Sequence, residues 1–335
     1  YDDEDLSQSY KYLGENNGFF SQQAFLGYQS YMINPVIIDD SNTQYVSNSN
    51  PDERPVNHDF FVTHSGKNSK HTFSLSAQYQ KNLYLGLNLN SHQTRFNRID
   101  NLIENNYGGA STFDYTEFEN NLLTLGEGFS FQFGAIYKAA KIRFGLSYHS
   151  PVWYKMTDEL LQSIITIKSD GNDTIDPGII NIYEYNMSTP SRYSGGLAYI
   201  FGSKGLISLQ YDLVSYQKAS FDIGNGDINF INQNEIINTK LKSAGTLKIG
   251  SEYRLGRLSF RCGYFNQESI NRKSTDFSKG TSFGLGYDFG GSALNFGFSS
   301  LVFNRSEPLY HNGLDDPIEI NKDQFQFLVS YSLKL

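Results

Sequence analysis

Long apolar runs are absent from this sequence of 335 residues, and nothing approaches the roughly 18 to 20 unbroken apolar residues of a membrane-spanning helix. A single cysteine, Cys262, excludes an internal disulfide. Because no second cysteine and no histidine stand at ligand spacing, we expect no metal site and no cofactor. The formal net charge of −8 argues against a nucleic-acid partner, since phosphate binding needs clustered lysine and arginine.

Catalytic motifs are also missing. His149 and Ser150 are adjacent rather than placed as parts of a triad, and the segment 145–149 lacks the second glycine of a nucleophile elbow. The sequence has no phosphate-binding glycine loop. We therefore expect no catalytic residues and no enzymatic activity.

Alternation of apolar and polar residues is what the sequence does have. At the C-terminus Phe325, Phe327 and Val329 alternate with Gln326, Leu328 and Ser330, which is the period of a strand. The mean hydropathy is only −0.45, but a membrane barrel keeps a low mean because only every second residue faces lipid. The pattern predicts eleven strands, at 73–79, 83–89, 129–137, 142–148, 193–201, 207–213, 247–253, 258–264, 283–289, 294–298 and 325–335.

The connections between these strands are alternately short and long. Outer-membrane barrels have short periplasmic turns and long extracellular loops, whereas a soluble β-sandwich would mix loop lengths at both ends. The sequence thus predicts an all-β, transmembrane antiparallel β-barrel whose long extracellular loops carry short helices. The tight turns are 80–82, 138–141, 202–205, 254–257 and 290–291, and the long connections are 91–127, 150–184, 217–238, 267–279 and 307–322.

The strand count raises a question about the N-terminal part. We expect residues 1–71 to be an extracellular loop or lid region and residues 72–335 to hold the barrel strands. An odd number of strands leaves an antiparallel barrel open, and unpaired backbone groups are costly in lipid. One or three strands should therefore be missing or hidden in residues 1–71, where 59–64 is the only weak candidate. The acidic start, residues 1–5, has no signal-peptide features, so we expect a mature or trimmed chain.

Three segments carry a family resemblance. Residues 145–158 (GLSYHSPVWYKMTD), 185–193 (YNMSTPSRY) and 249–254 (IGSEYR) resemble the FadL family of hydrophobic-compound transporters (OmpP1/FadL/TodX), in its Bacteroidetes form. The resemblance covers roughly residues 70–335. It implies a bacterial outer-membrane barrel of 14 strands with an N-terminal plug, of which the eleven strands here would be the last eleven. It also implies uptake of long-chain fatty acids or other apolar molecules, with release through a gap at an early strand.

The resemblance also points to an outer docking site on two loops, here 91–127 and 150–184. Both hold apolar residues where a loop should be polar, and in the second loop the spacing of four is that of one face of a short helix. A landing patch for an amphiphile and two loop helices packed on each other remain equal alternatives. A further stretch with Phe25, Tyr28 and Met32 is expected to be a lid helix that packs rather than binds. The candidate patch is Phe118, Leu122, Leu123, Met156, Leu160, Leu161 and Ile164.

Charged residues fall on the polar face of several predicted strands. A fatty-acid carboxylate needs a cation, and arginine offers it a bidentate fork. Alternatively the charges pair in a ladder, Lys248 and Arg254 with Glu252 or Asp212, and fill the barrel. Lys155 and Arg192 could instead contact lipopolysaccharide or a head group. The candidate head-group ligands are Arg143, His149, Lys248, Arg254 and Arg261.

These observations favour passive uptake of hydrophobic or amphiphilic molecules, such as long-chain fatty acids, across the outer membrane. The expected partners are outer-membrane lipid, lipopolysaccharide and a hydrophobic small-molecule substrate, and another membrane protein is a further candidate. Two alternatives remain: a non-transporting barrel that is a subunit of a larger, secretion-type assembly, and a general porin.

Overall fold

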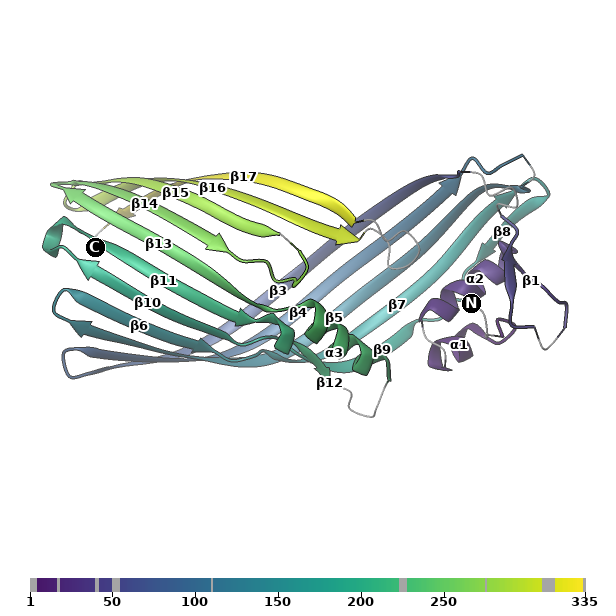
Figure 1. The fold of residues 1–335 in the computed structure, drawn as a ribbon, viewed down its shortest axis with the longest axis horizontal. Helices are drawn as coiled ribbons and strands as arrows, with labels where there is room; N and C mark the ends of the chain where they lie inside the picture. Colours follow the sequence, from purple (N-terminus) through teal and green to yellow (C-terminus); the bar gives the residue numbers. More distant parts are fainter. Residues whose placement is uncertain are drawn as a thin grey trace. The chain divides into compact units, whose positions relative to one another are not determined.

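The computed structural model describes residues 5–16, 19–39, 42–49, 55–109, 111–222, 228–274, 276–308 and 317–333 (Figure 1). The chain forms two compact units. Unit 1 comprises Tyr1–Ser69, Gln93–Glu127 and Lys155–Glu184, and unit 2 comprises Lys70–His92, Gly128–Tyr154 and Tyr185–Leu335. No helix among the described residues is long and apolar enough to cross a membrane.

Among the described residues, eleven strands of one 15-stranded sheet follow one another as antiparallel neighbours, and they are the eleven strands that the alternation predicted. Each pairs with the next in chain order, and β6, β10, β11 and β13 run side by side in Figure 1. Residues 334 and 335, the end of the last predicted strand, lie outside the described part. The strands are β3 (Asn57–Tyr79), β4 (Leu83–Asn105), β5 (Phe113–Ala139), β6 (Ile142–His149), β10 (Arg192–Ile200), β11 (Gly205–Ser215), β13 (Ser243–Leu255), β14 (Leu258–Gln267), β15 (Phe277–Asp288), β16 (Ser292–Pro308) and β17 (Pro317–Leu333).

The tight turns lie where they were predicted, and three of them have glycine at a positive φ, among them the turn 202–205 with Gly202 at φ +62°. Gly256, between β13 and β14, has φ +60°, and Gly290, between β15 and β16, has φ +97°. Residues with a Cβ rarely adopt these values. The turns hold the strands in register, so that Cys262 faces Phe283 and Phe283 faces Phe298 across two strand pairs.

The two faces of the unit 2 sheet differ in chemistry. One face carries exposed apolar side chains, among them Leu146 (71% exposed), Phe283 (59%) and Phe327 (78%). The other face carries serine, glycine, glutamine and charged residues, such as Ser147 and Asp212. An exposed apolar face of this extent on a long antiparallel sheet is the surface that contacts lipid in a transmembrane barrel.

Both edges of this sheet are open among the described residues. β3 pairs only with β4, and β17 pairs only with β16. Both edge strands run toward the tight turns, so direct pairing of β3 with β17 would be parallel. An odd number of added strands would give an antiparallel closure, and the 14-stranded barrel therefore stays a prediction.

Unit 1 corrects the expectation of two long polar loops. β4 runs on to Asn105 and β5 starts at Phe113, and β7 (Trp153–Lys168), β8 (Gly171–Ile175) and β9 (Asn181–Ser188) occupy most of 150–184. β3, β4 and β5 have 23, 23 and 27 residues, whereas a membrane-crossing strand needs about 9–11. The surplus residues form the sheet of unit 1. The weak candidate 59–64 belongs to β3, and the expected boundary after residue 71 falls inside the same strand.

The helix predicted around Met156, Leu160 and Ile164 is wrong, because these residues lie in β7. A spacing of four is a multiple of the strand period as well as a helical one. Gln162 and Thr166, which are also buried, complete an alternation of two that the apolar residues alone did not reveal.

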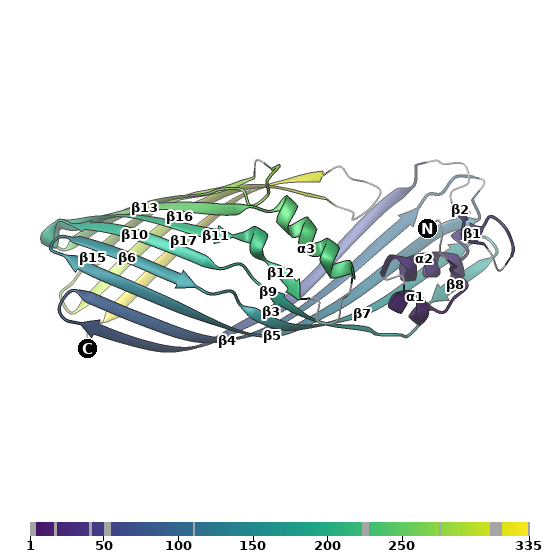
Figure 2. The ribbon, with the colours of Figure 1, turned by 60° about the horizontal axis from the view of Figure 1, so that its bottom comes forward.

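Helices occur elsewhere. α1 (Tyr10–Asn16) and α2 (Phe19–Gln29) lie side by side in unit 1, as Figure 2 shows, and Leu6, Leu13 and Ala24 form a buried cluster with them. Phe25 and Tyr28 are part of α2, so the predicted helix is present there, whereas Met32 follows it. The remaining elements are β1 (Ile33–Pro35) and β2 (Tyr45–Ser47) in unit 1, and η1 (Gly202–Lys204), η2 (Tyr216–Lys218), β12 (Ser220–Asp222) and α3 (Ile228–Lys240) in unit 2.

Candidate functional site

A groove of about 490 Å³ lies on the polar face of unit 2. It follows β4, β5, β6, β10 and β11, and its floor is made of residues with little or no side chain. Asn88, Gln132 and Gln210 supply amides at its walls, and Tyr84 and Ile136 supply larger surfaces. The floor consists of Gly86, Gly134, Gly145, Ser147, Ser194 and Gly196.

Strand register brings these glycines together. Gly145 of β6 is opposite Gly196 of β10, and Gly134 of β5 is opposite Ser147 of β6. A Cβ added at Gly145 would meet no atom of the described part of the chain within 4 Å. Since glycine weakens a strand by lacking a side chain that packs, glycines gathered on one face indicate that something approaches the backbone closely there.

An ion-pair cluster adjoins the groove at Asp212, whose side chain is only 2% exposed. Asp212 pairs with Arg192 and, at 2.8 Å, with Lys248. It also accepts a hydrogen bond of 2.8 Å from Gln210 Nε2, and Gln210 and His149 both line the groove. Arg192 Nε is buried and has no hydrogen-bond partner among the described residues. Two cations share one carboxylate, so the cluster keeps a net positive charge.

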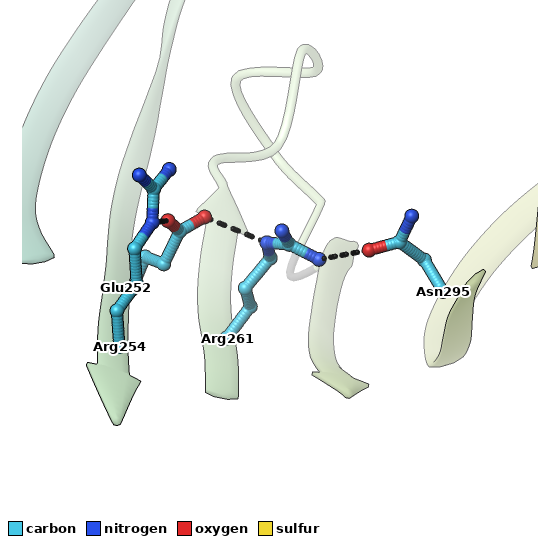
Figure 3. Close-up of polar contacts among 4 residues, drawn as sticks. All are labelled: Glu252, Arg254, Arg261 and Asn295. Carbon is cyan, nitrogen blue, oxygen red and sulfur yellow. Dashed lines mark hydrogen bonds and ion pairs between the residues drawn. The ribbon is translucent and has the colours of Figure 1, made fainter. Parts of the chain in front are cut away.

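A second cluster lies close to the tight turns, on β13, β14 and β16 (Figure 3). Glu252 stands between two arginines: Arg254 Nε donates to Oε1, and Arg261 Nε donates to Oε2 at 2.7 Å. Arg261 Nη1 also donates to Asn295 Oδ1 at 2.9 Å. We refer to Glu252, Arg254, Arg261 and Asn295 as the turn-side cluster.

The predicted head-group ligands therefore fall into separate places. His149 lines the groove, and Lys248 belongs to the Asp212 cluster. Arg254 and Arg261 form the turn-side cluster, while Arg143 donates to the carbonyl oxygens of Ala140 and Ile142 at 2.7 and 2.9 Å. Lys248 with Asp212 and Arg254 with Glu252 are the pairings of the ladder alternative.

The candidate apolar patch is not one surface. Met156, Leu160 and Ile164 are buried, whereas Leu161 lies on the other face of β7 and is 37% exposed. Ile164 packs in a core with Tyr10 and Leu26, and Phe118 packs against that core. Leu122 and Leu123 are half-buried neighbours on opposite faces of β5. For Ile164 and Phe118 the contacts are those of structural packing.

Polar contacts hold α1 and α2 on the sheet of unit 1. The Tyr10 hydroxyl donates to Gln162 Oε1 at 2.7 Å, and Gln162 Nε2 donates to Asn120 Oδ1 at 2.7 Å. Gln22 and Asn181 exchange amide hydrogen bonds of 3.0 and 3.1 Å. Burial raises the pKa of Tyr10 to about 12, so its hydroxyl remains a donor at neutral pH.

Replacement of Gln162 by leucine is expected to loosen α1 and α2. The change leaves the buried Tyr10 hydroxyl without its acceptor and the half-buried Asn120 Oδ1 without this donor, which costs about 1–3 kcal/mol. Amide hydrogen exchange in residues 10–29 should accelerate by roughly tenfold or more. Ser163→Leu, one residue along on the opposite face of β7, is the matched control, and equal acceleration in both variants would contradict the role of Gln162.

Sequence reasoning missed the groove. The glycines of β15 on the polar face were visible as an alternation, but the groove glycines stand on four strands and come together only through register. Gly86, Gly134, Gly145 and Gly196 share the polar phase of their strands, and that shared phase is the signal that could have indicated them.

No protein-family model and no curated protein matches the sequence. Among solved structures, a FadL homologue of Pseudomonas aeruginosa matches with a TM-score of 0.55 at 15% identity, over 81% of this chain and 68% of that chain. The CymD monoaromatic hydrocarbon channel matches with a TM-score of 0.40 at 12% identity, over 83% and 88%. The Pseudomonas putida toluene transporter TodX matches with a TM-score of 0.38 at 13% identity, over 84% and 87%.

The match to the FadL homologue confirms the fold that the motifs indicated. In a bilayer only helices and barrels satisfy their backbone groups, and long antiparallel strands with one apolar face are those of outer-membrane barrels. The chain has the all-β fold of a FadL-type transporter, that of a bacterial outer-membrane barrel.

Proposed function

We propose that the chain takes up hydrophobic or amphiphilic molecules across the outer membrane. The glycine-floored groove carries this proposal, because it is an open groove along the polar face of a FadL-type fold. Hydrocarbon needs room close to the backbone and few polar groups to desolvate. The floor offers glycines and serines, and the amides at the walls are few.

Long-chain fatty acids are the substrates that we favour within this class. The Asp212 cluster stands next to the groove with two cations for one carboxylate, and Arg192 Nε is without a partner there. A carboxylate can bind to Arg192 or Lys248 while its chain lies along the groove. The buried Asp212 limits the positive charge, so that an anionic head group is held weakly enough to move on.

Uptake by cells that lack the gene tests this function. We expect the deletion to lower uptake of a radiolabelled fatty acid, and expression of the full protein to restore it. Unchanged uptake of both a fatty acid and an aromatic hydrocarbon would refute transport. Steady single-channel conductance in planar bilayers would instead identify a porin, and co-purification in a stable larger assembly without uptake would identify a subunit.

A further inference from the structure

The turn-side cluster holds more positive charge than its own carboxylate neutralises. Arg254 and Arg261 both use their Nε atom on Glu252, and Arg261 uses one Nη atom on Asn295. Guanidinium groups have five donors each. The side chains of Arg254 and Arg261 are 57% and 41% exposed, whereas Glu252 is 15% exposed. The remaining N–H donors of the two guanidinium groups are therefore exposed to solvent, whereas the carboxylate of Glu252 is largely covered.

Glycines in β15 make this arrangement possible. Arg261 reaches across β15 to Asn295 of β16, as Figure 3 shows. A Cβ at Gly286 would lie 2.4 Å from Asn295 Oδ1 and 3.2 Å from Arg261 Nη1, and a Cβ at Gly284 would lie 3.3 Å from Arg261 Cβ. Larger residues at these two positions would displace the arginine. The cluster is therefore built into the wall rather than formed by mobile surface side chains.

The cluster lies on the same face of β13 as the Asp212 cluster, but nearer to the tight turns. Lys248, Gly250, Glu252 and Arg254 alternate along β13 on the polar face. Lys248 pairs with Asp212. Glu252 follows Lys248 by four residues along β13, which is about 13 Å at 3.3 Å per residue. Gly250, between them, places no side chain in the path.

We propose that the turn-side cluster is a second anion-binding station, which takes the carboxylate or phosphate head group of a transported amphiphile after it leaves the Asp212 cluster. The inference rests on the proposed function and extends it, because it gives the passing molecule a negative head group and a direction along β13. Arg254 and Arg261 bind the head group. Glu252 holds the two guanidinium groups apart and lowers their affinity for the head group.

Variants that remove either the positive or the negative charges of the cluster test the station. In full-length protein in neutral-lipid nanodiscs, binding of decyl phosphate and of decanoate is measured by calorimetry. Arg254→Gln with Arg261→Gln should weaken binding by about tenfold or more, because the charge-assisted hydrogen bonds are lost. Glu252→Gln should strengthen it several-fold. A merely structural cluster would predict no gain in Glu252→Gln, and unchanged binding there would overturn the proposal.

Two controls distinguish an amphiphile from free phosphate as the ligand, and loss of charge from loss of a hydrogen bond as the cause of weaker binding. Excess inorganic phosphate should compete poorly with decyl phosphate, and equal competition would overturn the assignment to an amphiphile. Asn295→Ala frees one bond of Arg261 without removing a charge, so it should change binding less than the arginine variants if the charges bind the head group. Loss of uptake on gene deletion with no effect of Glu252→Gln rejects the station alone, whereas unchanged uptake with stronger binding in Glu252→Gln rejects the proposed function alone.

Discussion

Gly196→Phe is expected to abolish uptake while the barrel still folds. Gly196 lies in the floor of the groove, opposite Gly145 on one side and Gln210 on the other. Among the residues that the structure describes, a Cβ there meets only Leu209 O within 4 Å, at 3.7 Å, which is an ordinary contact, so the ring enters the groove rather than the protein interior. A phenyl ring there projects into a groove of about 490 Å³ and obstructs it. Uptake of the labelled fatty acid should fall by an order of magnitude or more.

Gly195→Phe is the matched control. It introduces the same side chain one residue earlier in β10, but on the apolar face, where its Cβ would lie 3.8 Å from Leu146 Cδ2. Successive side chains of a strand point to opposite faces. Folding yield should be equal in the two variants, and uptake should be retained in Gly195→Phe. Normal uptake by folded Gly196→Phe would show that the groove is not the route.

The fold could be predicted largely from the period of the sequence. Each strand of unit 2 has one face in lipid, which forces strict alternation, and segments such as 283–289 therefore stand out. The extension of β3, β4 and β5 beyond the membrane-crossing length could not be seen in this way, and neither could β7. Those residues form a sheet covered in part by α1 and α2, where buried positions include Gln162 and Thr166 as well as leucine and isoleucine. Hydrogen bonding, not hydropathy, satisfies such positions.

The site could be predicted only in its chemistry. Charges such as Lys248 and Glu252 were visible on the polar face, and so was the possibility that they pair. The partner of each cation depends on strand register and on the length of its side chain. Arg261, for example, extends over Gly286 to Asn295. The groove depends on glycines of four strands. The pattern within one strand cannot indicate that these glycines lie close together.

Asp212→Ala is expected to destabilise the barrel more than any other removal of a single charge in unit 2. Asp212 is 2% exposed and is the shared partner of Arg192 and Lys248. Removing one partner of a buried pair leaves uncompensated charge at a cost of about 3–5 kcal/mol. Arg192 and Lys248 are 38% and 43% exposed and can turn partly to water, so we expect the low end, about 3 kcal/mol. Denaturant unfolding in lipid vesicles measures this loss.

Glu252→Ala provides the comparison that isolates burial. It also removes a carboxylate shared by two cations, but Glu252 is 15% exposed whereas Asp212 is 2% exposed, and pairs that water reaches contribute only about 0–1 kcal/mol. Adding Lys248→Ala to Asp212→Ala should restore part of the lost stability, because one of the two unpaired cations is then gone. Equal losses for Asp212→Ala and Glu252→Ala, or no recovery in the double variant, would mean that Asp212 acts through packing and not through charge.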